Sequence, residues 1–119
     1  MASYQELIVW QKAMEVAQKI YLIVKKLPKE EMFALSDQMR RAAVSIPSNI
    51  AEGQERNSQK EFVQFLKIAQ GSRAELETQL LICVQVKYLT EQEIQSAMNM
   101  LLEIRKMINA MTRQLITHN

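Results

Sequence analysis

Several residue types that would point to another fold or compartment are nearly absent from this chain of 119 residues. Two glycines and two prolines leave little material for the turns that a β-rich fold needs. The single cysteine, Cys83, excludes an internal disulfide and is typical of a reducing compartment, so we expect a cytoplasmic location. No apolar run approaches the roughly 18 residues of a membrane span, and residues 1–6 do not resemble a signal peptide. We therefore expect no membrane partner.

Residues that usually carry catalysis are also scarce. The only histidine, His118, stands next to the C-terminus, so no Ser–His or Cys–His pair is expected around Cys83, which should be a buried thiol. Neither a glycine-rich phosphate loop nor a Glu-x-x-His metal motif is present. Glu75 and Glu77 project about 160° apart on a helix and cannot act as one acid–base pair, whereas Glu77 and Arg73 predict a partly buried structural ion pair. We predict a protein that is not an enzyme, with no catalytic, cofactor-binding or metal-binding residue.

Charge gives weak guidance about partners. Fifteen basic and thirteen acidic residues leave a formal net charge of +2, which alone does not argue for nucleic acid. Aromatic residues make up 6% of the chain, too few for the stacking platforms of single-strand binders. Basic residues nevertheless form loose groups, and a ring-like oligomer would multiply even a weak patch. The candidate nucleic-acid contacts are Lys25, Lys26, Lys29, Arg40, Arg56, Lys60, Arg105, Lys106 and Arg113.

Apolar residues recur at helical spacing along most of the chain. The pattern Ser/Thr-x-x-Glu at Ser3, Ser58 and Thr90 predicts three capping boxes, each at the start of a helix. Pro28 ends the first helix and suits the first turn of the second, while Gly53 suits the C′ position that follows the second helix. The expected helices cover residues 4–27, 28–53, 58–87 and 90–116.

Short connections between long helices imply antiparallel neighbours. We predict an all-α fold with a single domain over residues 1–119, an up-down-up-down antiparallel four-helix bundle. Pro47 falls inside the second helix, where proline removes a hydrogen bond and costs roughly 3 kcal/mol. The apolar period continues from Leu35 to Gly53 all the same, so we expect a second helix that is kinked at Pro47.

The apolar stripes of the first and fourth helices are wider than a monomeric bundle requires. Each covers close to half of the helix circumference, against a stripe of somewhat over 100° in a typical surface helix. The apolar residues expected outside the core seam are Val9, Val16, Ile23, Met100, Met107 and Ile116. We predict a homo-oligomer in which these two helices supply much of the contact.

A polar stripe follows one face of the second helix. Its members project within about 80° of one another in an ideal helix. They are Gln38, Arg41, Ser45, Asn49 and Glu52. Three interpretations stay open: solvated surface, a hydrogen-bond network at a helix or subunit boundary, and a ligand site. We favour the network, because carbonyl groups near Pro47 need donors.

Four segments together resemble one protein family: Leu7–Ala13, Leu27–Glu30, Gln38–Gly53 and Gly71–Glu77. They resemble the 23S rRNA intervening-sequence protein family, which is similar to the Avd accessory proteins of diversity-generating retroelements. The resemblance spans nearly the whole chain and implies a four-helix protomer, assembly into a five-membered barrel, binding of RNA or DNA through a basic surface, and no known catalysis. The family's signature positions fall on Arg41, Ser45, Pro47, Asn49, Glu52, Gly53, Ser72, Glu75 and Glu77. Arg73 departs from the pattern, since an apolar or small residue is expected there.

We include Glu75 with the polar stripe in the predicted structural network. The leading hypothesis is a non-enzymatic, pentameric bundle that binds structured RNA or DNA, with a protein partner as a further candidate. The alternative is a structural or protein-interaction module that binds no nucleic acid.

Overall fold

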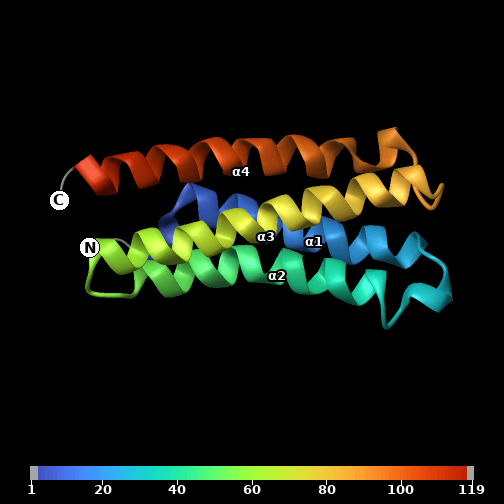
Figure 1. Ribbon diagram of the computed structural model, residues 1–119, viewed down its shortest axis with the longest axis horizontal. Helices are drawn as coiled ribbons and strands as arrows, with labels where there is room; N and C mark the ends of the chain where they lie inside the picture. Colours follow the sequence, from blue (N-terminus) through green and yellow to red (C-terminus); the bar gives the residue numbers. More distant parts are fainter. Residues whose placement is uncertain (1–2, 118–119) are drawn as a thin grey trace.

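Four long helices run alternately up and down one axis in the computed structural model, which describes residues 3–117 (Figure 1). They are α1 (Ile8–Ile23), α2 (Leu35–Gln54), α3 (Gln59–Gln85) and α4 (Glu91–Thr117). We call the end where α1 begins and α4 ends the terminal end, and the opposite end, where residues 24–34 and 86–90 turn, the corner end. The all-α, antiparallel four-helix bundle predicted from the sequence is confirmed.

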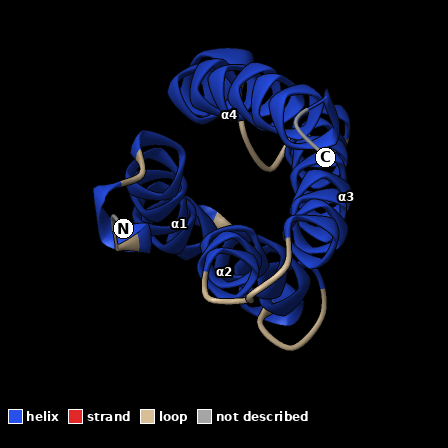
Figure 2. Cartoon of the chain, turned by 90° about the vertical axis from the view of Figure 1, so that its left-hand side faces the viewer, coloured by secondary structure: helices blue, strands red, loops and turns tan. Residues whose placement is uncertain are grey.

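The helices follow one another around the bundle axis in chain order (Figure 2). α1 packs against α2 and α4, and α3 packs against the same two helices. All four contribute fully buried side chains to one core: Ile20, Met39, Ile46, Ile50, Leu66, Leu76, Leu80, Leu101, Ile104 and Ile108. Removing each such side chain from water stabilises the fold by about 1.5–3 kcal/mol, which makes this core the main source of stability.

The first helix starts later than predicted. The Ser3–Glu6 capping box forms with both of its hydrogen bonds, but it caps a 3₁₀ turn, Tyr4–Glu6. Leu7 then takes an extended conformation (φ −71°, ψ 125°), so α1 begins at Ile8 and not at residue 4. The capping bonds close a single turn, and the apolar period does not reveal that Leu7 interrupts the helix after it.

The face that α1 buries also differs from the expected one. Val9 and Val16 were expected outside the core seam, yet they are 1% and 0% exposed, and both belong to the core. Met14 and Tyr21 are 45% and 47% exposed instead. A helix that is apolar over half of its circumference offers two faces, and periodicity cannot choose between them. The face that lies in the bundle interior is formed by Val9, Ala13, Val16 and Ile20.

The second helix begins at Leu35, not at Pro28 as predicted. Pro28 is extended (φ −59°, ψ 150°) and precedes a 3₁₀ turn, Lys29–Glu31. The Glu31 carboxylate accepts hydrogen bonds from the Tyr88 hydroxyl at 2.8 Å and from the Leu35 amide at 3.3 Å. These bonds tie the corner to the end of α3 and hold residues 28–34 as a connection between helices.

α2 continues without interruption through Pro47, which is buried inside it. The kink at Pro47 stays a prediction. Gly53 is not the C′ residue, because the helix runs to Gln54 and no glycine has a positive φ in the described chain. A Cβ atom at Gly53 would lie 2.7 Å from Phe65 Cβ and 2.9 Å from Phe62 Cδ1, so glycine allows α2 and α3 to approach closely.

A Schellman motif ends α3 two residues before the predicted boundary. Lys87 has a φ of 70°, and its amide donates to the Val84 carbonyl while the Tyr88 amide donates to the Cys83 carbonyl. The predicted capping box then opens α4, where Thr90 and Glu93 exchange backbone-to-side-chain hydrogen bonds of 2.9 and 3.1 Å. This sharp turn places the second half of α4 beside the first half of α3.

Candidate functional site

The centre of the polar stripe forms a small hydrogen-bonded cluster between α2 and α3. The hydroxyl groups of Ser45 and Ser72 lie 2.8 Å apart. The Asn49 side-chain amide donates to the Ser45 carbonyl at 2.8 Å and to the Ser45 hydroxyl at 2.9 Å. Because Ser45 Oγ accepts from Asn49, its own proton is available to Ser72. All three residues are half-buried, and they join the two helices just before and after Pro47.

The outer members of the stripe lie apart from this cluster. Arg41 has a side chain that is 80% exposed, and its Nε donates to Asp37 on the same helix at 2.9 Å. Glu52 accepts at 2.8 Å from Arg56, which lies just beyond the end of α2. Gln38 is exposed. The structure therefore brings Ser45, Asn49 and Ser72 together and leaves Arg41, Glu52 and Gln38 at the surface; a network along the whole stripe stays a prediction.

Glu75 interacts with a residue that the sequence analysis did not single out. The Gln79 side-chain amide donates to the exposed Glu75 carboxylate at 3.3 Å. Gln79 is only 5% exposed, and its Oε1 has no hydrogen-bond partner within residues 3–117. The sequence does not reveal that Gln79 is buried, because many other polar residues of α3 are exposed.

A second polar chain joins α3 to α4. Arg73 donates to Glu77, as the predicted ion pair requires, and to Gln70 Oε1 at 2.6 Å. Gln70 in turn donates to Asn109 Oδ1 at 2.8 Å and to the Arg105 carbonyl at 3.2 Å. Arg73 is only 12% exposed, and polar partners along the α3–α4 boundary accommodate its charge.

Cys83 is a buried core residue, as predicted. Its side chain is 0% exposed, and the thiol points to the Met39 sulfur at 3.8 Å. Burial, and to a smaller extent the negative charge of Glu31, raise the pKa of the thiol from 9.0 to about 11. The thiolate that would act as a nucleophile is therefore disfavoured.

We expect Cys83 to react slowly with iodoacetamide at pH 8 in the native protein and rapidly in urea. With a pKa of about 11, only about one thiol in a thousand is ionised at that pH. Because the folded pKa lies above the unfolded one, the free energy of unfolding should be constant below pH 9 and fall as the pH rises toward 11. Mass spectrometry of alkylated protein follows the reaction, and a native rate equal to that of a free thiol would contradict the assignment.

Within residues 3–117 no group of three His, Cys, Asp or Glu residues lies close enough together to hold a metal ion. His118 lies outside the described residues. No helix in the same part of the chain combines the length and hydropathy needed to cross a bilayer.

The predicted nucleic-acid contacts fall at two ends of a molecule that is 47 Å long. Lys25, Lys26, Lys29 and Arg40 lie at the corner end. Among them, Lys26 forms an ion pair with Glu93 of α4 at 2.9 Å. This ion pair, together with a hydrogen bond from the Thr90 amide, lowers the pKa of Glu93. Lys26 thus links helices at the corner.

Arg56 lies at the terminal end, where carboxylates and an aromatic ring surround it. Its guanidinium group is 2.8 Å from Glu52 and 3.7 Å from Glu61, and it stands 4.9 Å above the ring of Phe65. These contacts stabilise the α2–α3 connection and reduce the charge available to a ligand.

The remaining candidates gather on one half of the α3–α4 pair. Antiparallel packing sets residues 59–73 of α3 beside residues 104–117 of α4 at the terminal end (Figure 1). We call these two segments the basic half, since they hold six basic residues and one acidic residue. The basic residues are Lys60, Lys67, Arg73, Arg105, Lys106 and Arg113. Residues 74–103, at the corner end, hold one basic and five acidic residues.

Four of the five exposed cations of the basic half form two rows. Lys60 and Lys67 are seven residues apart on α3, and Lys106 and Arg113 are seven residues apart on α4. Residues at that spacing differ by about 20° in direction and lie about 10 Å apart along the helix. All four are exposed, and none has an ion-pair partner within residues 3–117. Lys67 was missed because the sequence analysis grouped charges along the chain and not across the helix pair.

These features define a helical-bundle protein with a polarised α3–α4 pair and no reactive side-chain cluster among the residues described. The model of the 23S rRNA-intervening sequence protein family matches residues 5–110, and the chain belongs to that family. A similar solved structure is the 1.70 Å crystal structure of a protein with unknown function from the S23 ribosomal protein family of Bacteroides thetaiotaomicron VPI-5482. It is 29% identical, with a TM-score of 0.82, over 88% of this chain and 98% of the other. No curated protein matches this chain.

Proposed function

We propose that this protein is a non-enzymatic homo-oligomer that binds structured RNA or DNA through the basic half. The observation that carries the proposal is the separation of charge along the α3–α4 pair, with six basic residues against one acidic residue at the terminal end. Electrostatic attraction to phosphates supplies most of the affinity of proteins that bind nucleic acid without reading sequence.

The spacing of the cations favours contacts with the phosphate backbone. Neighbouring helix axes lie about 8–10 Å apart, which is close to the spacing of about 10 Å within each row. Lys60, Lys67, Lys106 and Arg113 therefore form an array that can follow a duplex surface. The array contains no aromatic side chain, so we expect recognition of backbone and shape, not of bases.

Exposed apolar side chains support self-association. Monomeric soluble proteins rarely expose large apolar patches. The exposed apolar side chains on the helices are Ile8, Met14, Tyr21 and Leu22 of α1, Val44 of α2, Ile68, Leu81 and Ile82 of α3, and Leu102 and Ile116 of α4. Their number on α1 supports this helix as a contact surface. Five copies is the stoichiometry that the family resemblance implies.

The alternative function is protein interaction without nucleic-acid binding. Phe33, in the corner before α2, is 90% exposed. An aromatic ring with so much of its surface in water favours a protein partner at that place. This candidate predicts no salt-dependent binding to nucleic acid.

We expect a fluorescently labelled RNA hairpin and a DNA duplex to bind with a strong dependence on salt. If the four exposed cations of the array each neutralise one phosphate, log K should fall with log[KCl] at a slope of about −3 to −4 per bound protomer. Fluorescence anisotropy between 25 and 300 mM KCl measures the slope, and native mass spectrometry of the same samples gives the number of copies. Absence of binding at the lowest salt concentration would remove the nucleic-acid function, and a monomer at tens of micromolar would remove the assembly.

A further inference from the structure

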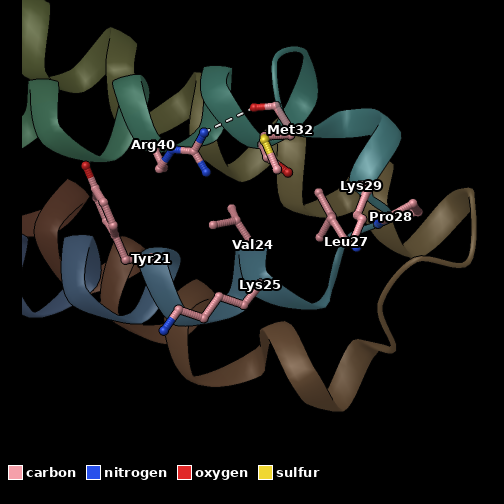
Figure 3. Close-up of a pocket in the computed structure, with 9 residues that line it drawn as sticks. Tyr21, Val24, Lys25, Leu27, Pro28, Lys29, Met32 and Arg40 are labelled. Carbon is pink, nitrogen blue, oxygen red and sulfur yellow. Dashed lines mark hydrogen bonds between the residues drawn. The ribbon is translucent and has the colours of Figure 1, made fainter.

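A cavity of about 370 Å³ opens between the end of α1, the corner and the first turns of α2 (Figure 3). Its lining comes from three consecutive segments of residues 21–40, which fold back on one another: Tyr21, Val24, Lys25, Leu27, Pro28, Lys29, Met32, Ser36 and Arg40. Figure 3 shows Val24 between the two helices, with Arg40 on the α2 side and with Tyr21 and Lys25 on the α1 side. The volume falls in the range of small-molecule sites, about 300–1,000 Å³.

The charged residues in the lining are all cationic. Lys25, Lys29 and Arg40 belong to the nine lining residues, and none of the nine is acidic. Lys25 and Lys29 are exposed and make no ion pair within residues 3–117. Arg40 donates to the Met32 carbonyl at 3.1 Å and approaches Asp37 only to 3.9 Å, so its guanidinium group is positioned but retains donors for a ligand.

The same lining contains a hydroxyl group on a residue that is otherwise buried. Ser36 is 3% exposed, and its side chain makes no hydrogen bond with any residue of 3–117. Its oxygen is not among the buried atoms without a partner, so it keeps contact with solvent and can bond to water or to a ligand that fills the cavity. Ser36 also lies in the first turn of α2, whose N-cap residue, Ala34, supplies no side-chain cap. The Glu31 carboxylate already accepts from the Leu35 amide at this helix end, so the attraction for an anion comes from the three cations of the lining.

The rest of the lining is apolar. Val24, Leu27, Pro28 and Met32 contribute aliphatic surface, and Tyr21 contributes an aromatic ring that is about half exposed. A simple inorganic anion would use the cations but not these side chains. A ligand that carries a phosphate on a flat, largely apolar body would use both, with the phosphate near Arg40 and Ser36 and the body against Tyr21 and Val24. The Lys25 ammonium group points away from Arg40 in Figure 3, and because it makes no ion pair within residues 3–117 it can turn toward the phosphate.

We propose that this cavity binds a nucleoside 5′-monophosphate group, either as a free nucleotide or as the 5′-phosphorylated end of a nucleic-acid chain. The site lies at the corner end, and the basic half lies at the terminal end, so it does not depend on the proposed function. A phosphate monoester supplies three acceptor oxygens and a second negative charge that forms near pH 6. Binding therefore strengthens as the pH rises from 5 to 7.

Isothermal titration calorimetry of the full chain with adenosine 5′-monophosphate and with adenosine tests the proposal. We expect the phosphate to improve affinity by at least about tenfold, and inorganic phosphate to compete. Lys25→Gln, Lys29→Gln and Ser36→Ala should each weaken nucleotide binding by about three- to tenfold. None of these three side chains has a partner whose loss would unfold the protein. The matched control is Lys106→Gln, which removes one exposed charge from the basic half and should leave nucleotide binding unchanged.

Two RNA tetramers, one with a 5′-phosphate and one with a 5′-hydroxyl, distinguish the two sources of the ligand. Equal affinity for the nucleotide and the phosphorylated tetramer identifies a free nucleotide, and a preference above about tenfold for the tetramer identifies a chain end. Either result supports the proposal. Equal binding of phosphorylated and unphosphorylated forms, no binding of either at millimolar concentration, or equal effects of Lys106→Gln and Lys25→Gln would overturn it.

Discussion

Gly53→Ala is expected to destabilise the protein by about 1–3 kcal/mol, although alanine is the better helix former by about 1 kcal/mol. The added Cβ would lie 2.7 Å from Phe65 Cβ and 2.9 Å from a ring carbon of Phe62. Phe65 Cβ is fixed to the backbone of α3, so relief requires the two helices to separate. Urea denaturation monitored by circular dichroism measures the loss.

Gly71→Ala is the matched control for this substitution. Gly71 also lies inside a helix, but a Cβ there would have no neighbour within 4 Å. The same chemical change should therefore stabilise by about 0.5–1 kcal/mol through helix propensity alone. If both variants were stabilised equally, the close approach of α2 and α3 at Gly53 would be wrong.

Asn49→Asp is expected to cost about 2–3 kcal/mol at pH 7, because it replaces a donor with a negatively charged acceptor. The Asn49 amide donates to the Ser45 carbonyl at 2.8 Å, and a carbonyl can only accept. An aspartate would repel that carbonyl, so its folded pKa would rise above the ordinary value of about 3.9. Stability should then recover as the pH falls through the raised pKa, since the protonated carboxyl can donate.

Gln38→Glu makes the same chemical change on the same helix at an exposed position. We expect it to change the free energy of unfolding by less than about 0.5 kcal/mol, and the same holds for Arg41→Ala, whose side chain is 80% exposed. Thermal denaturation at pH 7 and pH 4 compares the three variants. Equal losses for Asn49→Asp and Arg41→Ala would show that the whole stripe is one network and that the cluster of three residues is incomplete.

Much of the fold could be predicted because local signals agree. The 3.6-residue apolar period and the Ser/Thr-x-x-Glu patterns at Ser58 and Thr90 predicted helices whose boundaries differ by a few residues from α3 and α4. At Ser58 only half of the predicted box forms within residues 3–117, the bond from the Glu61 amide to the Ser58 hydroxyl. The largest miss is the corner at residues 28–34, where Glu31 bonds to Tyr88, 57 residues away. A contact with so distant a residue leaves no trace in the apolar period, so the second helix was predicted from Pro28 although it begins seven residues later, at Leu35.

The candidate site was predictable only in part, for a related reason. The stripe on α2 contains the correct residues for a cluster, but Ser72 of α3 decides which of them take part. The basic half likewise depends on how helices pair, since Lys67 and Arg113 are far apart in sequence and share one end of the bundle in the fold. Spacing within one helix predicts faces, whereas contacts between helices select among them.

The segment around Pro47 therefore contributes to architecture more than to ligand binding. Its proline and Ile46 and Ile50 are buried, its polar cluster bonds to α3, and its glycine permits close packing against Phe65. The cations that we assign to ligand binding lie away from this segment, toward the two ends of the bundle.

The most direct test of the account compares two double variants in binding to an RNA hairpin with a 5′-hydroxyl end, which gives the corner cavity no terminal phosphate. Lys106→Gln with Arg113→Gln removes two charges from the basic half, and Lys25→Gln with Lys29→Gln removes two from the corner end. Fluorescence anisotropy at 50 mM KCl should show a loss of at least about tenfold for the first and less than about twofold for the second, with a salt slope about 2 units shallower for the first alone. Equal losses for the two variants, or wild-type affinity in the first, would contradict the assignment of nucleic-acid binding to the basic half.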